Sequence, residues 1–93
     1  MNPQAPLGEF EQLVLLAVMR LEGDAYAVPI RQEIEERTSR SVARGALYVT
    51  LDRLEEKGYL KSWLADATAE RGGRAKRYYE VKRAGVKALE HSW

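Results

Sequence analysis

The segment ERGGRAKRYYEV, residues 70–81, gathers most of the side chains that could bind a polyanion. It places four cations around two adjacent glycines: Arg71, Arg74, Lys76 and Arg77, with Gly72 and Gly73. Arginine binds phosphate bidentately and enters narrow, strongly negative minor grooves, and glycine at a hairpin tip lets the backbone approach a surface closely. The segment therefore predicts contact with nucleic acid. The alternative is that Arg77 and the two tyrosines only pack across a hairpin.

Charge is distributed unevenly along the 93 residues. Residues 1–36 contain two cations and seven anions, whereas residues 37–87 contain thirteen cations and six anions. A basic second part favours a polyanionic partner. An ordinary solvated surface is the alternative, because 31% of charged residues is only modestly above the average.

The elements that position these cations follow from the spacing of the apolar residues. Helical spacing changes to alternation at Tyr59, and a loop that contains glycine joins two strand-forming runs. The predicted elements are three helices, two strands and a last helix, over residues 9–22, 26–38, 43 or 44–57, 59–64, 77–81 and 84–93. This is the order of a winged helix-turn-helix, a mainly α fold with a small β-hairpin (α+β). We expect a disordered tail at 1–7, the winged-helix domain at 8–83 and the start of a C-terminal dimerisation helix at 84–93.

The second and third helices each have a predicted inner face. The side chains expected to face the core are Ile30, Ile34, Leu47, Leu51 and Leu54. The second helix should turn its charged and amide side chains outwards: Arg31, Gln32, Glu35 and Glu36.

The outer side of the third helix is the predicted reading surface for DNA. Gly45 and Ala46 are small, so this helix could lie deep in a groove. Arg44 could reach guanine or phosphate, and Tyr48 offers a hydroxyl to phosphate and a ring to a thymine methyl group. Val49, Arg53 and Lys61 complete the predicted contacts outside the glycine-containing segment. The alternatives are a solvated Arg44 and a half-buried Tyr48.

The first helix is apolar nearly all round, which predicts burial on more than one side. A chain of this length has little protein to cover such a helix twice, so a second subunit is the expected cover. The predicted interface is made of apolar residues of the first and last helices: Phe10, Leu13, Val14, Leu16, Val86, Leu89 and Trp93. The alternative is a central core helix.

Catalytic and metal chemistry find no support in the sequence. There is no cysteine, and the single histidine, His91, has no second histidine or cysteine with which to bind a transition metal. The carboxylates fall in helical acidic runs, and Gly72 and Gly73 lack the pattern of a nucleotide-binding loop. We therefore expect no enzyme, no metal and no cofactor.

Two further features concern location and ligands. The N-terminus has no signal-peptide pattern, and the longest apolar run, residues 13–19, is too short to span a membrane. A soluble intracellular protein with no membrane partner is expected. Trp63 and Trp93 are candidates to line a pocket for a small-molecule effector, which the sequence does not name. The alternatives are a strand residue packed on a helix and an interface or end-of-chain residue.

Four blocks of sequence resemble a known family: LGEFEQLVLLAVMRL, DAYAVPIRQEIEERT, ARGALYVTLDRLEEKGYL and ERGGRAKRYYEV. They resemble the PadR family of bacterial winged-helix transcriptional repressors, its short subfamily in particular, from about Leu7 to Glu90. The resemblance implies a homodimer in the bacterial cytoplasm that binds a palindromic operator on the nucleoid until some signal relieves repression. Gly45 and Tyr48 match the family's recognition-helix motif, and its wing motif matches Arg71, Gly72, Gly73, Arg74 and Arg77.

The sequence departs from the family pattern in four places. Ala43 stands where Ser or Thr is common, so a helix cap is lost, at a typical cost of about 0.5–2 kcal/mol. Ala27 replaces a frequent glycine, and Lys82 replaces a frequent threonine. The last helix stops at Trp93, where family members usually continue and pair with the other subunit. Two expectations follow: either the protein is shortened, or it dimerises mainly through the first helix.

The predicted function is that of a sequence-specific regulator, a repressor, that binds double-stranded DNA as a homodimer on an inverted repeat. One alternative is a winged helix that uses the same hairpin and helix face to bind an acidic protein partner. A second is a regulator whose DNA binding is controlled by exchange of the partner subunit.

Overall fold

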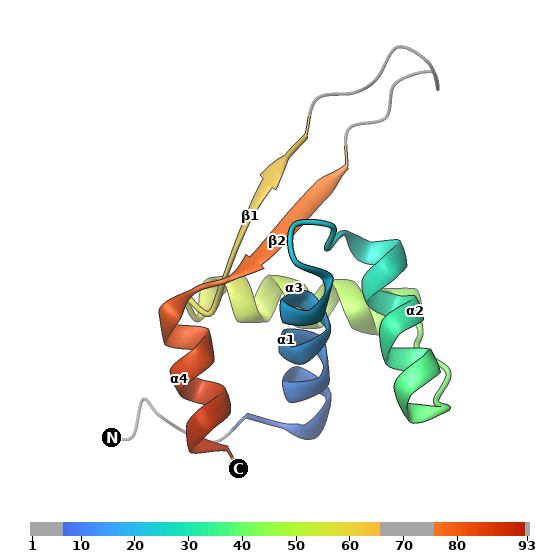
Figure 1. Cartoon of the computed structure of the whole chain (residues 1–93), viewed down its shortest axis with the longest axis horizontal. Coiled ribbons are helices and arrows are strands. Elements are labelled where there is room, and N and C mark those ends of the chain that lie inside the picture. Colours follow the sequence, from blue (N-terminus) through green and yellow to red (C-terminus); the bar gives the residue numbers. More distant parts are fainter. Residues whose placement is uncertain (1–6, 66–75, 93) are drawn as a thin grey trace.

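The structure is a computed structural model that describes residues 7–65 and 76–92. Its elements, in chain order, are α1 (Glu9–Leu21), α2 (Ala27–Thr38), α3 (Arg44–Glu56), β1 (Leu60–Leu64), β2 (Arg77–Val81) and α4 (Arg83–His91) (Figure 1). The two strands pair antiparallel. The predicted fold class and the predicted order of elements are confirmed, and the differences at the ends of elements are one or two residues.

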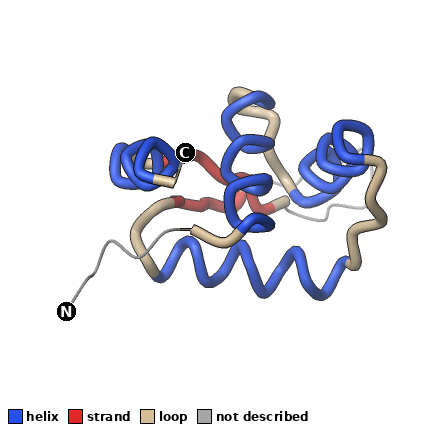
Figure 2. The backbone as a smooth tube through the Cα atoms, turned by 90° about the horizontal axis from the view of Figure 1, so that it is seen from below, coloured by secondary structure: helices blue, strands red, loops and turns tan. Residues whose placement is uncertain are grey.

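The helices surround α1, which lies at the centre of the molecule. Figure 1 shows α2 on one side of α1 and α4 on the other, with α3 crossing behind it. Figure 2 gives the same arrangement from below, with α3 running across the molecule under α1. The hairpin of β1 and β2 projects away from the helices at one end (Figure 1). This arrangement leaves one side of α3 and the neighbouring hairpin open to a partner.

One hydrophobic core joins all the helices to the base of the hairpin. The predicted inward residues of α2 and α3 are all buried, at no more than 2% exposure: Ile30, Ile34, Leu47, Leu51 and Leu54. They pack with Leu15 of α1, Leu60 of β1 and Tyr79 of β2. Because α3 fills the core with one face only, its other face is held at a defined orientation.

The hairpin is fixed to the helical body on both sides of β2. Leu60 pairs with Val81 and Leu64 with Arg77, which sets the register. On the other edge of β2, the Tyr79 N–H donates to the Ala25 carbonyl at 2.9 Å, in the connection between α1 and α2. The base of the hairpin is therefore part of the rigid domain, and its orientation relative to α2 is set by backbone hydrogen bonding.

Leu7 corrects the prediction of a disordered tail at residues 1–7. Its side chain is 5% exposed, and its N–H donates to the Ser92 hydroxyl at 3.1 Å. The Gln12 side-chain amide donates to the Leu7 carbonyl at 3.1 Å. The sequence contains no local signal for this, because Leu7 is held by the far end of the chain. The rest of the predicted tail lies outside the described residues.

Two residues of the predicted dimer interface are core residues of the single chain. Val14 is fully buried and Leu89 is 2% exposed, so no surface of either is left for a second subunit. The physical reason is that α1 is a central core helix, which was the alternative interpretation of its pattern. The other predicted interface residues within the described part are half-buried: Phe10, Leu13, Leu16 and Val86. Trp93 lies outside the described residues.

Glu11 connects α1 to α3 and predicts a dependence of stability on pH. Its carboxylate accepts hydrogen bonds from the Gly8 N–H and from Lys57 Nζ, both at 2.9 Å. Burial opposes ionisation, but these hydrogen bonds outweigh it and hold the pKa of Glu11 below its usual value. Because the folded-state pKa is lowered, the contribution to stability is present above the unfolded-state pKa and is lost as pH falls through the folded-state pKa.

We therefore expect Glu11→Gln to lower the free energy of unfolding at pH 7 by about 0.5–1 kcal/mol. The difference from wild type should shrink towards zero in acid, below the usual glutamate pKa of about 4.3. Urea unfolding at a series of pH values measures it. Glu56→Gln, an exposed carboxylate on α3, is the control. A difference that stays constant down to low pH would contradict the assignment.

Candidate nucleic-acid interface

The outer face of α3 carries the predicted DNA contacts. The structure places all of them on the surface: Arg44, Gly45, Tyr48, Val49 and Arg53. Tyr48 is 45% exposed and Val49 is 56% exposed, high values for large apolar side chains on a helix whose other face is buried. Tyr48 is thus partly covered and partly open to solvent. Ala43, the N-cap residue of α3, offers no side-chain hydrogen-bond acceptor to the first turn, so the N–H groups at the positive end of the helix dipole are left without a side-chain cap.

The connection between α2 and α3 is clamped by two residues of α2. Arg31 Nε donates to the Val42 carbonyl at 2.8 Å, and the Val42 N–H donates to the Glu35 carboxylate at 2.8 Å. Arg31 and Glu35 also form an ion pair at 3.6 Å, one helical turn apart. The sequence predicted only that both side chains face outwards. Their separation of four residues is the one local signal of the pair, and nothing local points to Val42.

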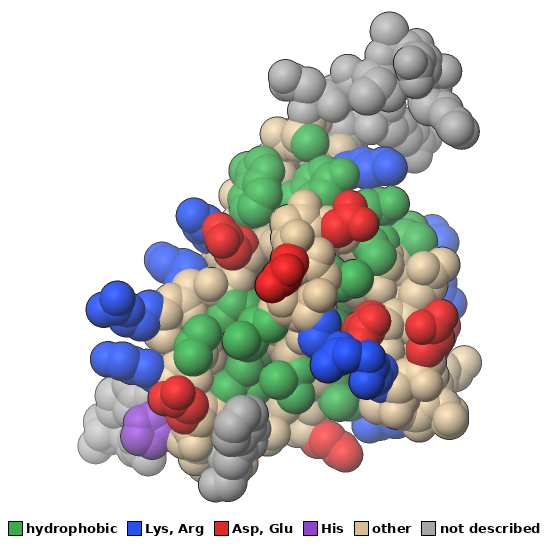
Figure 3. All heavy atoms as spheres, in the orientation of Figure 1, with side chains coloured by type: hydrophobic (Ala, Val, Ile, Leu, Met, Phe, Trp, Pro, Cys, Tyr) green, Lys and Arg blue, Asp and Glu red, His purple; other side chains and the backbone are tan. Residues whose placement is uncertain are grey.

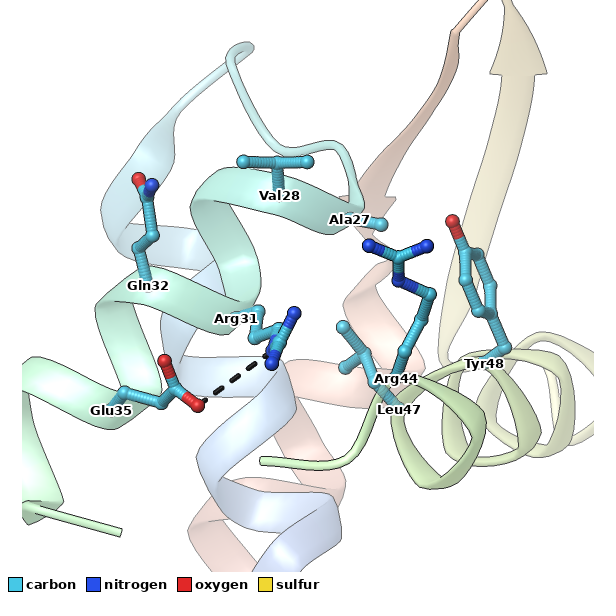
Figure 4. A pocket seen from close by; sticks show the side chains of 8 residues that line it. All are labelled: Ala27, Val28, Arg31, Gln32, Glu35, Arg44, Leu47 and Tyr48. Carbon is cyan, nitrogen blue, oxygen red and sulfur yellow. Dashed lines mark ion pairs between the residues drawn. The ribbon is translucent and has the colours of Figure 1, made fainter. Parts of the chain in front are cut away.

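A hollow of about 410 Å³ lies between α2 and α3. Arg31, Glu35 and Gln32 line it from α2, and Arg44 and Tyr48 line it from α3. Figure 4 shows Arg44 and Tyr48 rising from α3 towards the start of α2, with Arg31 reaching from α2 towards α3. Sequence reasoning missed the α2 part of this surface.

A second hollow, of about 290 Å³, continues this surface to the hairpin. Its lining shares Ala27, Val28 and Tyr48 with the first hollow and adds Lys76 and Arg77 at the start of β2. The outer face of α3, the start of α2 and the basic end of β2 thus form one continuous surface. We call it the α2–α3–β2 surface.

The cations of β2 are partly held by neighbours. Arg77 donates to the Ser62 hydroxyl at 2.9 Å, and Ser62 donates to the Glu55 carboxylate at 2.7 Å. Lys76 Nζ lies 4.5 Å from the centre of the Tyr26 ring, which is a cation–π contact. Both side chains are still exposed, so each is orientated by its neighbour while its charge faces solvent. Arg77 therefore contacts Ser62 across the hairpin and still exposes its charge to solvent.

The two hairpin tyrosines differ. Tyr79 is 3% exposed, and burial raises its pKa, so its hydroxyl stays neutral. Tyr78 lies on the other face of the strand, where its ring is 5.3 Å from that of Tyr26 and 6.2 Å from that of Trp63. The two neighbouring tyrosines of β2 therefore lie on opposite faces of the strand. The rings of Tyr26, Tyr78 and Trp63 connect the start of α2 to the hairpin.

Comparison with known proteins shows the family to which the chain belongs. The family described as "Transcriptional regulator PadR-like family" matches residues 15–91. The chain belongs to this family. An uncharacterised protein from Lysinibacillus sphaericus is 32% identical over 80 residues, which cover 84% of this chain and 69% of that protein.

Solved structures share the PadR-like fold. A transcriptional regulator from Clostridium thermocellum is 26% identical with a TM-score of 0.70, and the match covers 87% of this chain and 73% of that one. A PadR family transcription regulator from Clostridium difficile has a TM-score of 0.71 and covers 88% of this chain and 81% of that one. At 23% identity the second shows the fold alone. The PadR-like chain is a DNA-binding transcriptional regulator, and members of the family are not enzymes.

Two other predicted residues, Lys61 and Trp63, lie outside the α2–α3–β2 surface. Lys61 pairs with Glu80 across the hairpin at 3.2 Å and lines neither hollow. Trp63 stacks on Tyr78, is 41% exposed and lines neither hollow. The predicted wing-tip contacts lie outside the described residues: Arg71, Gly72, Gly73 and Arg74.

The described part of the PadR-like chain contains no candidate metal centre and no candidate membrane-spanning helix. Residues 7–65 and 76–92 contain no group of three or more His, Cys, Asp or Glu side chains that could hold a metal ion. Within the same ranges no helix has the length and apolar character needed to cross a bilayer. The His91 side chain is exposed at the end of α4.

Proposed function

We propose that this PadR-like regulator is a repressor that binds an inverted-repeat operator as a homodimer. In each subunit, α3 would enter the major groove and the hairpin would contact the neighbouring backbone or minor groove. The α2–α3–β2 surface carries this proposal, because it joins the exposed Arg44 and Tyr48 of α3 to the exposed Lys76 and Arg77 of β2. Arg71, Gly72, Gly73 and Arg74 would extend the contact at the wing tip, as their residue types suggest.

The homodimer is supported by apolar side chains that the single chain covers only in part. Phe10, Leu13 and Leu16 of α1 and Val86 of α4 are half-buried. Figure 3 shows apolar side chains gathered on the face where α1 and α4 lie. We propose that α4 begins the dimerisation element and that α1 joins it. In a symmetric dimer the two α3 helices would meet half-sites about one turn, roughly 34–36 Å, apart.

Regulation would take place on the nucleoid in the cytoplasm, without a cofactor. A small molecule that relieves repression is part of the proposal, and its chemistry is left open. Repression would follow from occupation of the operator, and transcription in vitro from a template carrying the selected operator would show it as a loss of transcript.

The test is selection from a pool of random duplexes at physiological salt, followed by sequencing of the bound fraction. An enriched inverted repeat, bound at least about 10³-fold more tightly than random DNA, would support a dimeric sequence reader. Binding without enrichment would contradict sequence-specific recognition. Absence of binding even at low salt would overturn the function and favour an acidic protein partner for the same surface.

A substitution at Gly45 should change stability and DNA binding in opposite directions. It is exposed in the first turn of α3, and an added Cβ would meet nothing within 4 Å. We expect Gly45→Ala to raise the free energy of unfolding by up to about 1 kcal/mol, because alanine is the better helix former. Binding of the selected duplex should nevertheless weaken about tenfold, because a methyl group would intrude where α3 meets the groove.

Urea unfolding and fluorescence-anisotropy titration measure the two effects of Gly45→Ala. Gly8→Ala is the matched control, because it adds a methyl group at an exposed position before α1, where the Cβ would make only an ordinary contact of 3.8 Å with Glu11. Unchanged duplex binding by Gly45→Ala would show that this part of α3 does not reach the floor of the groove.

A further inference from the structure

Two arginines from different helices face the hollow between α2 and α3. Arg31 belongs to α2 and Arg44 is the first residue of α3, and both line the same space of about 410 Å³. Figure 4 shows their side chains approaching this space from opposite sides. A pair of guanidinium groups converging from two helices is a typical arrangement for binding phosphate.

Arg31 is orientated before any ligand arrives. Its Nε donates to the Val42 carbonyl at 2.8 Å, and its side chain is 40% exposed. Among the described residues, its two Nη groups donate no hydrogen bond, so both can donate to a ligand. A guanidinium group that is already held along one edge loses little further freedom on binding.

The charge of the hollow favours an anion. Among the residues that the structure describes, Glu35 is the one carboxylate that lines it, and this carboxylate already accepts the Val42 N–H at 2.8 Å. Two guanidinium groups therefore face a single carboxylate that is engaged with the backbone. The side chains of Gln32 and Tyr48 add neutral hydrogen-bond donors at the same place.

We propose that this hollow, named here the α2–α3 phosphate site, binds one phosphate group of the DNA backbone through Arg31 and Arg44. The inference rests on the proposed function, because the bound duplex supplies the phosphate. It extends that function by making Arg31 of α2 a DNA contact, and it predicts where the backbone crosses the protein. A free phosphate ion offers the same chemistry, so the two sources are separated below.

The test compares Arg31→Gln, Arg44→Gln and the double variant with wild type. Each single variant should bind random duplex about 10- to 100-fold more weakly, as expected for a lost charge-assisted contact. The slope of log K against log salt should become shallower by about 0.9 for each bound subunit whose phosphate is no longer neutralised. The double variant should lose less than the product of the single losses, because both residues contact the same group.

Arg37→Gln is the matched control. It removes the same charge from the same helix, and Arg37 is likewise paired with a glutamate one turn away, Glu33, at 2.9 Å. Arg37 lines a different hollow, between α1 and α2, so its variant should keep the wild-type salt slope. Arg44→Gln should fold like wild type, so its weaker binding cannot be due to unfolding. Within the described residues the Arg44 side chain makes no hydrogen bond or ion pair that the substitution would remove.

Neutral methylphosphonate groups, introduced one at a time into a selected duplex, separate the two sources of phosphate. At one position in each half-site, neutralisation should weaken wild type about as much as Arg31→Gln does, and should leave the double variant unaffected. That result assigns the site to the DNA backbone. Equal sensitivity of wild type and the double variant at every position would overturn the inference while leaving DNA binding intact.

Titration with inorganic phosphate at constant ionic strength tests the free ion. If inorganic phosphate displaces duplex from wild type but not from Arg31→Gln, the result would support the phosphate site. If wild type binds no duplex, the proposed function fails. The phosphate site can still be tested by the NMR chemical shift of the Arg31 Nε–H, which should change when inorganic phosphate is added. Absence of such shifts would then overturn it.

Discussion

Replacing Gly85 by alanine is expected to destabilise the folded chain by about 3 kcal/mol, at the upper end of the usual range for overpacking. A Cβ at this position would lie 2.5 Å from the Tyr59 carbonyl oxygen and 2.8 Å from Val81 Cγ1. The Tyr59 peptide cannot easily move, because its carbonyl accepts the Lys82 N–H and its own N–H donates to the Leu54 carbonyl, both at 2.9 Å. Relief would require α4 to shift away from the end of α3 and the base of the hairpin.

Urea unfolding followed by tryptophan fluorescence measures the effect of Gly85→Ala. Gly45→Ala is the control, because the same substitution there enters open space. A chain with stability of roughly 5–15 kcal/mol would lose a large part of it, and duplex binding should fall with the folded fraction. An unchanged unfolding midpoint would mean that α4 packs against Tyr59 less closely than the geometry requires.

Leu51→Ala is expected to cost about 2–5 kcal/mol, because it removes a fully buried side chain and leaves a cavity beneath α3. Val49, two residues earlier on the same helix, is 56% exposed, and Val49→Ala should change the free energy of unfolding by less than about 0.5 kcal/mol. The pair separates the two faces of α3. One face orientates the helix, and the other is available to a duplex.

DNA binding should be affected in the opposite order to stability: Val49→Ala should be impaired and Leu51→Ala should not. Leu51→Ala should bind duplex normally under conditions where it is folded, whereas Val49→Ala should stay folded and lose discrimination at one base pair, by about 10-fold if Val49 contacts a thymine methyl group. Selection from random duplexes with each variant measures this. If Val49→Ala selects the same operator with the same strength, Val49 is not a base contact.

Part of the interface was predictable because its signals are local. The spacing of Leu47, Leu51 and Leu54 defines an inner face of α3, so the positions of Arg44 and Tyr48 on the surface follow from helix geometry. Alternation along β2 separates the buried Tyr79 from Tyr78 in the same way. These predictions needed no knowledge of what packs against each element.

The predictions that failed depended on contacts between distant segments. Leu7 is buried because the end of α4 returns beside the start of α1, and Val14 and Leu89 are core residues because α2, α3 and α4 together cover α1. A pattern that is apolar all round shows that a helix is covered, but it does not show whether the same chain or a second one covers it.

The sequence by itself determined the order of the elements, the winged-helix fold, the family and the outward face of α3, because periodicity and motifs are properties of neighbouring residues. Only the tertiary structure decided that Arg31 and Glu35 clamp Val42. It also showed that α2 supplies most of the lining of the hollow that Arg44 faces. The reason is physical: which side chains of two separate helices meet depends on the angle and distance at which the shared core packs them, and no local pattern encodes these.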